Sequence, residues 1–143
     1  MKIKRTGSVI WNGGIKDGKG AISTQSGALK GYPYGFASRF DDLPGSNPEE
    51  LLAAAHAGCF TMALSLILGE ANLRAEQLDT SAEVTLESVD GGYAISTIHL
   101  RLRGKVPGAD EETFARLAAA AKAGCPVSKV LNAEITLDAE LVG

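Results

Sequence analysis

Two cysteines are the residues of this chain whose type and spacing suggest chemistry. Cys59 lies in "HAGCF", three positions after His56 and inside the uncharged apolar run 51–68, and Cys125 lies in "AGCPVSK". The chain has no other cysteine and no CxxC motif, so the pair does not form a disulfide-rich framework. The two thiols are therefore either core residues or redox partners.

Cys59 needs a cation before it can react. A thiolate attacks and a thiol does not, and an apolar site raises the pKa of a cysteine. The surrounding run contains no cation, so the strongest candidate is Arg39, which stands just ahead in the segment 34–40. We predict that this segment is extended, with Arg39 pointing away from Phe36 and Phe40. A guanidinium stays protonated and can bind a thiolate and a carboxylate together.

The carboxylate that could orient Arg39 is Glu49, in the first turn of the predicted helix that carries Cys59. In a helix, ten residues correspond to about 15 Å along the axis and about 80° around it, too far for one arginine to contact both groups. An antiparallel copy of the helix from a second subunit would bring them together. It would also cover the helix face that one sheet leaves exposed. We therefore predict an obligate homodimer.

Cys125 stands directly before the predicted short helix "CPVSKVLN", where Pro126 takes the first helical position. Cys125 is then the N-cap, and free N–H groups at the helix start favour a lowered pKa for its thiol. Such a thiol can attack an oxidised cysteine and close a disulfide.

The position of His56 suggests two possible chemical roles. It could form a Cys-His nucleophile with Cys59, or a zinc site with Cys59 and Cys125. The zinc site lacks an obvious fourth ligand. We favour a buried histidine bonded to a backbone or hydroxyl group.

The elements that must position these residues follow from hydrophobic periodicity and from helix and turn signals. The start of the central helix is predicted by Asn47 as the N-cap, Pro48 at the first helical position and two glutamates in the first turn. The turn "DGG" predicts a hairpin between two alternating segments. The expected fold is α+β, with antiparallel sheets around a long buried central helix. The predicted elements are a hairpin from strands 3–11 and 19–24, a helix 48–71, strands 76–89 and 93–106, a helix from Asp110 to Gly124, and a last strand 134–142.

Composition excludes several classes of function. The chain has 143 residues, 45% of them hydrophobic, which suits one domain over 1–143. Its 14 basic and 17 acidic residues are scattered, so nucleic acid is not an expected partner. The N-terminus lacks the pattern of a signal peptide, which predicts a cytoplasmic protein. The run 51–68 is long enough for a membrane span, but its small and polar residues and acidic flanks argue against one.

Four segments resemble one known family over essentially the whole chain. They are "WNGGIKDGKG", "PYGFASRF", "GSNPEELLAAAHAGCFTMALSLIL" and "AKAGCPVSKVLNAEITLD". They are similar to the OsmC family of osmotically inducible proteins, which is related to the organic hydroperoxide resistance (Ohr) proteins. The resemblance implies an intertwined homodimer built from swapped sheets around central helices.

The resemblance also implies a thiol peroxidase that reduces organic hydroperoxides. Cys59 would be the peroxidatic cysteine, oxidised to a sulfenic acid, and Cys125 the resolving cysteine that forms a disulfide with it. Arg39 and Glu49 would activate Cys59. An external thiol, expected to be a dithiol, would reduce the disulfide. No cofactor and no metal are required.

The apolar residues Phe36, Phe40, Phe60 and Met62 suit an alkyl or lipid hydroperoxide better than hydrogen peroxide. A different class of function stays open beside the enzyme: a non-catalytic dimeric protein that binds an apolar ligand at its interface.

Overall fold

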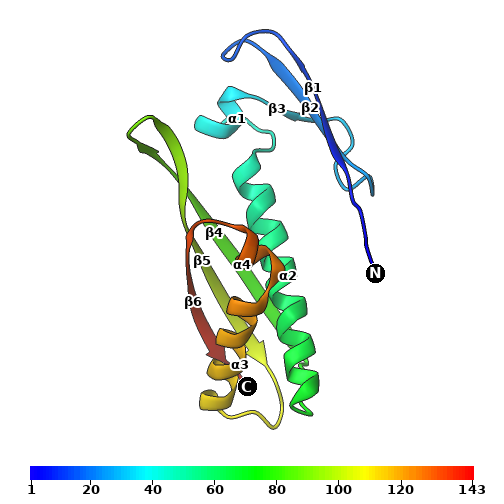
Figure 1. The fold of residues 1–143 in the computed structure, drawn as a ribbon, viewed down its shortest axis with the longest axis vertical. Helices are drawn as coiled ribbons and strands as arrows, with labels where there is room; N and C mark the ends of the chain where they lie inside the picture. The colour runs from blue at the N-terminus through cyan, green and yellow to red at the C-terminus, as the bar shows by residue number, and fades with distance from the viewer. The chain divides into compact units, whose positions relative to one another are not determined.

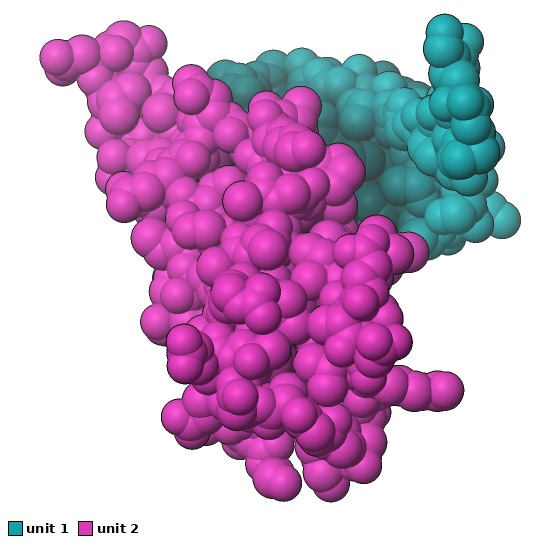
Figure 2. Space-filling model, turned by 60° about the horizontal axis from the view of Figure 1, so that its bottom comes forward, with its two compact units in different colours: residues 1–51 teal, residues 52–143 magenta.

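A computed structural model describes all residues, 1–143, and divides them into two compact units, 1–51 and 52–143 (Figure 2). The helices and strands are labelled in Figure 1. Along the chain the elements follow in the order β1, β2, β3, α1, α2, β4, β5, α3, α4 and β6. The first unit contains the elements up to the start of α2, and the second contains the rest, so each unit has both helices and strands. The expectation of one domain over 1–143 stays a prediction.

The first unit contains a three-stranded antiparallel sheet. Its strands are β1 (Gly7–Asn12), β2 (Lys19–Thr24) and β3 (Tyr32–Tyr34), with β2 in the middle. The predicted hairpin is confirmed, although its first strand begins at Gly7 and not at residue 3. The tilted rings of Trp11 and Tyr34 pack at 5.6 Å between centroids, which ties the two edge strands together across β2.

The segment predicted as extended over 34–40 is helical from Phe36, so that prediction was wrong. The helix α1 (Phe36–Phe40) is started by Ser38, whose Oγ accepts a hydrogen bond from Gly35 N at 2.9 Å. Phe36 and Phe40 still share a face, because positions i and i+4 are neighbours on a helix, and their ring centroids lie 4.8 Å apart. Arg39 does not point away from the phenyl rings, since its guanidinium lies 5.4 Å from the Phe40 ring centroid.

The long helix α2 (Pro48–Glu70) begins and ends as its sequence predicts. Asn47 caps it, accepting a hydrogen bond from Glu50 N at 2.8 Å. After its last turn Asn72 adopts a left-handed conformation at φ 59°, and Leu73 N binds Leu68 O at 2.8 Å.

Only one stripe of α2 is fully covered by its own chain. His56, Phe60, Leu64 and Leu68, each four residues from the next, are at most 1% exposed. The opposite face carries Met62 at 77% exposure and Leu66 at 66%. The single chain thus leaves the outer face of α2 exposed, as expected, and the covering of this face by a second subunit stays a prediction. By length and composition α2 could also cross a membrane, and the absence of a span stays a prediction.

The second unit contains a sheet of mixed direction. The strands β4 (Gln77–Val89) and β5 (Gly92–Lys105) form the predicted antiparallel hairpin. The strand β6 (Glu134–Leu141) pairs with β5 in parallel, so the expectation of purely antiparallel sheets was wrong. The reason is the connection, because the helices α3 (Glu111–Gly124) and α4 (Pro126–Val130) carry the chain back along the sheet before β6 begins.

One face of this sheet packs against α2 and α3 (Figure 1). Ile98, Leu100 and Leu102 of β5 are buried, whereas Arg101 and Arg103 between them are exposed, as the alternation predicts. The core closes around Phe114 of α3, which is 1% exposed. Cys125 belongs to the same core, so packing of α3 on the sheet fixes the place of the second thiol.

Candidate active site

Cys125 stands between two helices, as the sequence predicts. It ends α3, with its amide bound to Ala121 O at 2.9 Å, and it is the N-cap of α4, with Pro126 at the first helical position. Its side chain is fully buried. The sulfur makes no regular cap hydrogen bond, but the amides of Val127 and Ser128 face it and favour its charged form.

The structure brings the two cysteines into direct contact. Both are free thiols, and the side chains of Cys59 and Cys125 lie close enough for each to shift the pKa of the other. Cys59 comes from the middle of α2 and is partly exposed, whereas Cys125 is closed off from solvent. The pair therefore has one accessible sulfur and one buried sulfur.

The surroundings of the two sulfurs shift their pKa values in opposite directions. Burial raises the pKa of Cys59, and the hydrogen bond with Cys125 raises it further, against a weaker opposing effect of the Val127 backbone. Burial also works to raise the pKa of Cys125, but the hydrogen bonds with Cys59 and with the backbone and hydroxyl of Ser128 outweigh it and hold that pKa below its usual value. Because each thiol shifts the pKa of the other, the two thiols titrate as a pair.

His56 is bonded to a hydroxyl group, which confirms the simplest of the three interpretations. Its Nε2 lies 2.8 Å from Ser128 Oγ, its side chain is fully buried, and its Nδ1 has no hydrogen-bond partner. Burial lowers the pKa of the ring, which keeps it neutral. No group of three histidine, cysteine or carboxylate side chains is placed to hold a metal ion, so the geometry does not favour the zinc alternative.

Arg39 and Glu49 form a close ion pair within the first unit. Arg39 Nη2 lies 2.7 Å from Glu49 Oε1, and Arg39 Nε contacts both carboxylate oxygens, at 3.1 and 3.3 Å. The carboxylate is mostly buried, with 12% of its side chain exposed, while 36% of the Arg39 side chain is exposed. A two-pronged contact of this kind fixes the guanidinium plane and leaves Nη1 free of this carboxylate.

Two hydrogen bonds hold α1 against the start of α2 and so make this ion pair possible. Ser38 Oγ donates to Ser46 O at 2.8 Å, and Asn47 Nδ2 donates to Ser38 O at 3.3 Å. Ser38 and Ser46 are both buried. The sequence singled out Arg39 and Glu49 but not these supporting residues, since serine in a short segment carries no distinctive pattern.

The apolar residues named from the sequence take three different positions. Phe36 and Phe40 flank Arg39 and line a pocket of about 230 Å³ with Trp11 and Tyr34. Met62 is exposed on α2. Phe60 is fully buried in the core of the second unit, so its predicted role beside a substrate was wrong. The structure thus defines an arginine-carboxylate pair beside a pocket in one unit and a thiol pair in the other.

Residues 40–140 match the family model described as OsmC-like protein. This range covers α2, both cysteine segments and the sheet on which they pack. The chain belongs to the OsmC-like family.

Curated relatives match this OsmC-like chain over two thirds of its length or more. It is 55% identical over 141 residues to peroxiredoxin OsmC of Escherichia coli (strain K12), covering 99% of each chain. It is 31% identical over 98 residues to organic hydroperoxide resistance protein OhrB of Bacillus subtilis (strain 168), covering 68% of this chain and 70% of that one.

Solved structures share the fold. The crystal structure of OhrB of Bacillus subtilis aligns with a TM-score of 0.73 at 30% identity, over 96% of this chain and 98% of that one. An OsmC-like protein of Vibrio cholerae aligns with a TM-score of 0.76 at 15% identity, over 96% and 99%. The α+β fold expected from the resemblance is therefore confirmed.

Proposed function

We propose that this OsmC-like chain is a thiol peroxidase that reduces organic hydroperoxides to alcohols with Cys59 and Cys125. Its relatives, peroxiredoxin OsmC and the organic hydroperoxide resistance proteins, support a peroxidase-type enzyme. The observation that carries the finer mechanism is the contact between the two sulfurs. Because the two sulfurs are already neighbours, they need only approach each other to form a disulfide.

The proposed reaction has three steps. The thiolate of Cys59 attacks the distal peroxide oxygen, the O–O bond breaks, and the alkoxide takes a proton and leaves as the alcohol. The Cys59 sulfenic acid then reacts with Cys125 to give a disulfide and water. An external thiol, which we propose to be a dithiol, supplies two electrons and restores both thiols by disulfide exchange.

The accessibility of the two sulfurs supports these roles. Cys59 is partly exposed and can meet a substrate, whereas Cys125 is fully buried and can meet only Cys59. Because its environment raises the pKa of Cys59, the attacking thiolate needs further stabilisation. We propose that Arg39, oriented by Glu49 and brought to Cys59 by the packing of a second subunit, provides it.

We also propose that the enzyme works as a cytoplasmic homodimer. Met62 and Leu66 give α2 an exposed apolar face, and a second copy of α2 would bury it. The pocket beside Arg39 is lined mainly by aromatic rings, which suits an alkyl hydroperoxide better than hydrogen peroxide.

A peroxidase assay with a dithiol reductant tests this function. Wild type is expected to consume an organic hydroperoxide faster than hydrogen peroxide. Cys59→Ser is expected to abolish turnover, because no sulfenic acid can form. Cys125→Ser should allow one oxidation per chain and then stop with the dithiol, because no disulfide can form.

Arg39→Lys is a sharper variant, since it keeps the charge and loses the two-pronged contact with Glu49. It should slow the first oxidation and leave the disulfide step unchanged. Equal multiple-turnover rates for wild type and Cys125→Ser would refute the resolving role. A protein that binds apolar compounds but consumes no hydroperoxide would support the non-catalytic alternative.

A further inference from the structure

Two facing pairs of residues connect α2 to α4. On α2, His56 and Cys59 are three positions apart, and on the opposing side Cys125 and Ser128 are also three apart, as the N-cap and the third helical residue of α4. Cys59 contacts Cys125, and His56 Nε2 lies 2.8 Å from Ser128 Oγ. Ser128, at the third helical position after the Cys125 N-cap, in turn lowers the pKa of the Cys125 thiol. The four side chains form one cluster, which we call the relay.

The direction of these hydrogen bonds follows from the chemistry of the serine. The Ser128 hydroxyl has one hydrogen, and the Cys125 thiolate can only accept it. If Ser128 donates to the sulfur, its oxygen must accept from His56, so the proton of the neutral imidazole sits on Nε2. The partnerless Nδ1 is then a bare lone pair and not a buried N–H without an acceptor.

We propose that His56 is a positioning residue that orients the Ser128 hydroxyl as a hydrogen-bond donor to the Cys125 sulfur and so prepares Cys125 for attack on oxidised Cys59. This inference rests on the proposed peroxidase function. It assigns His56 no contact with the hydroperoxide and no proton transfer.

The step that the relay assists is the closing of the disulfide. The Cys125 thiolate gives an electron pair to the sulfur of the Cys59 sulfenic acid, the S–S bond forms and the S–O bond breaks. The hydroxide that leaves takes up a proton from solvent, which balances the proton that Cys125 released on becoming a thiolate, and so becomes water. Cys125 is oxidised and the sulfenic sulfur is reduced. A donor on Cys125 keeps that sulfur in the anionic form that attacks.

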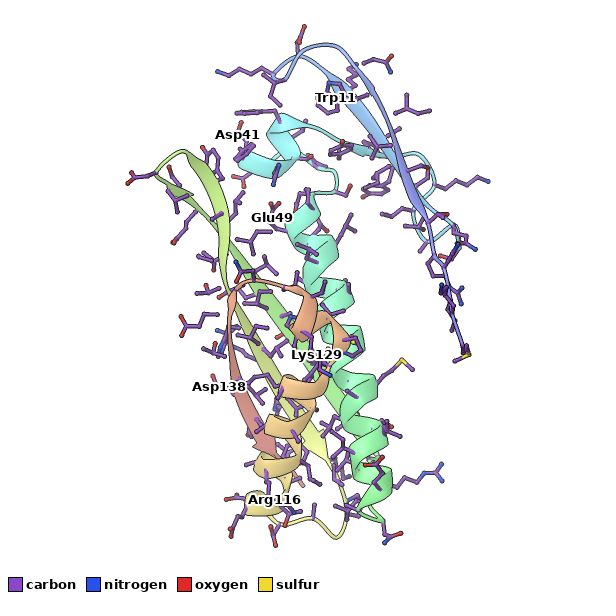
Figure 3. All side chains as sticks on the ribbon, viewed as in Figure 1. Trp11, Asp41, Glu49, Arg116, Lys129 and Asp138 are labelled. Carbon is purple, nitrogen blue, oxygen red and sulfur yellow. The ribbon has the colours of Figure 1, made fainter.

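Charged side chains near these residues do not explain the same effect. Lys122 on α3 directs its ammonium to Ile135 O, at 3.3 Å. Lys129 on α4, which is labelled in Figure 3, is exposed, and so is Glu134 at the start of β6. The helix α2 carries no charge between Glu50 and Glu70. The titratable group that acts on each sulfur is the other sulfur. Neutral hydrogen bonds are therefore what distinguishes Cys125.

The relay can be tested without a substrate by titrating the ultraviolet absorbance of the thiolate. In a Cys59→Ser background only Cys125 contributes. Ser128→Ala should move the titration of Cys125 to higher pH, and His56→Leu should move it in the same direction. His56→Gln should restore much of the wild-type titration, because its amide nitrogen can donate where Nε2 does. Ser81→Ala, an exposed serine on β4, is the matched control and should change nothing.

A single-turnover experiment in the two-cysteine chain tests the consequence for the reaction. After one equivalent of an organic hydroperoxide, sulfenic acid is trapped and disulfide is measured over time. In Ser128→Ala the rate of the disulfide step relative to the first oxidation should fall about tenfold or more, as expected for losing a hydrogen bond to a charged group.

The outcomes separate the relay from the enzyme. Normal wild-type turnover with an unshifted thiolate titration in Ser128→Ala would refute the relay alone. A wild type that forms no sulfenic acid would refute the peroxidase and with it the role of the relay in disulfide closure, while a shifted titration would still support the hydrogen bond. Since His56 is fully buried, circular dichroism should verify its variants, and the half-buried Ser128 decides the result if they do not fold.

Discussion

The close packing of Gly104 under Phe114 gives a sharp prediction about the scaffold of the thiol pair. A Cβ placed on Gly104 would lie 2.5 Å from the ring tip of Phe114, 2.8 Å from a second ring atom and 3.2 Å from Leu78. Ordinary contacts between carbon atoms lie near 3.5–4.0 Å, so the overlap approaches 1 Å. Phe114 is 1% exposed in the core and has no room to turn aside. Gly104→Ala should therefore lower the free energy of unfolding by about 1–3 kcal/mol.

Urea unfolding followed by circular dichroism measures this loss. The matched control is Gly69→Ala in the last turn of α2, where an added Cβ meets nothing within 4 Å. The same chemical change should stabilise there, by up to about 1 kcal/mol. A second variant, Phe114→Leu, should couple favourably with Gly104→Ala, by about 0.5–3 kcal/mol. Equal effects of the two alanines, or strict additivity of the double variant, would refute the reasoning.

Two further predictions concern assembly and pH. Met62→Lys, on the exposed face of α2, should convert the proposed dimer to a monomer, as measured by light scattering. The control variant Ser81→Lys, on the exposed side of β4, should leave the dimer intact. A dimer that persists in Met62→Lys would contradict the proposed interface. Hydrogen bonds from Thr113 hold the pKa of Asp110 below its usual value, so its cap stabilises the fold at neutral pH and is lost as pH falls through the folded pKa. Asp110→Asn keeps an acceptor but does not titrate, so its urea midpoint should fall less on acidification than that of wild type; identical acid profiles would contradict this account.

Local sequence signals predicted the structure correctly where a single residue type sets the local backbone conformation. Asn47 and Asp110 cap their helices as predicted, each accepting a hydrogen bond from the amide three residues ahead, at 2.8 and 2.7 Å. The "DGG" turn joins β4 and β5 as predicted. Caps and tight turns depend on neighbours in the chain, so they can be predicted without the fold.

The errors occurred where more distant contacts decide. The segment ending in Phe40 alternates like a strand, but Ser38 Oγ accepts from Gly35 N and donates to Ser46 O, and these bonds favour a helical turn. The direction of β6 depends on the path of α3 and α4, and this path places β6 parallel to β5. Phe60 looked available to a substrate because the sequence does not say which side of α2 faces the core.

The sequence by itself singled out the two thiols, the arginine and the carboxylate as candidates, because their types, caps and motifs are readable in short segments. The tertiary structure decided which sulfur is buried and which is partly exposed, and it placed Ser128 between His56 and Cys125. The physical reason is distance along the chain. His56 and Ser128 belong to helices separated by two strands and α3, and only packing brings a hydroxyl without a sequence signature to the atom it serves.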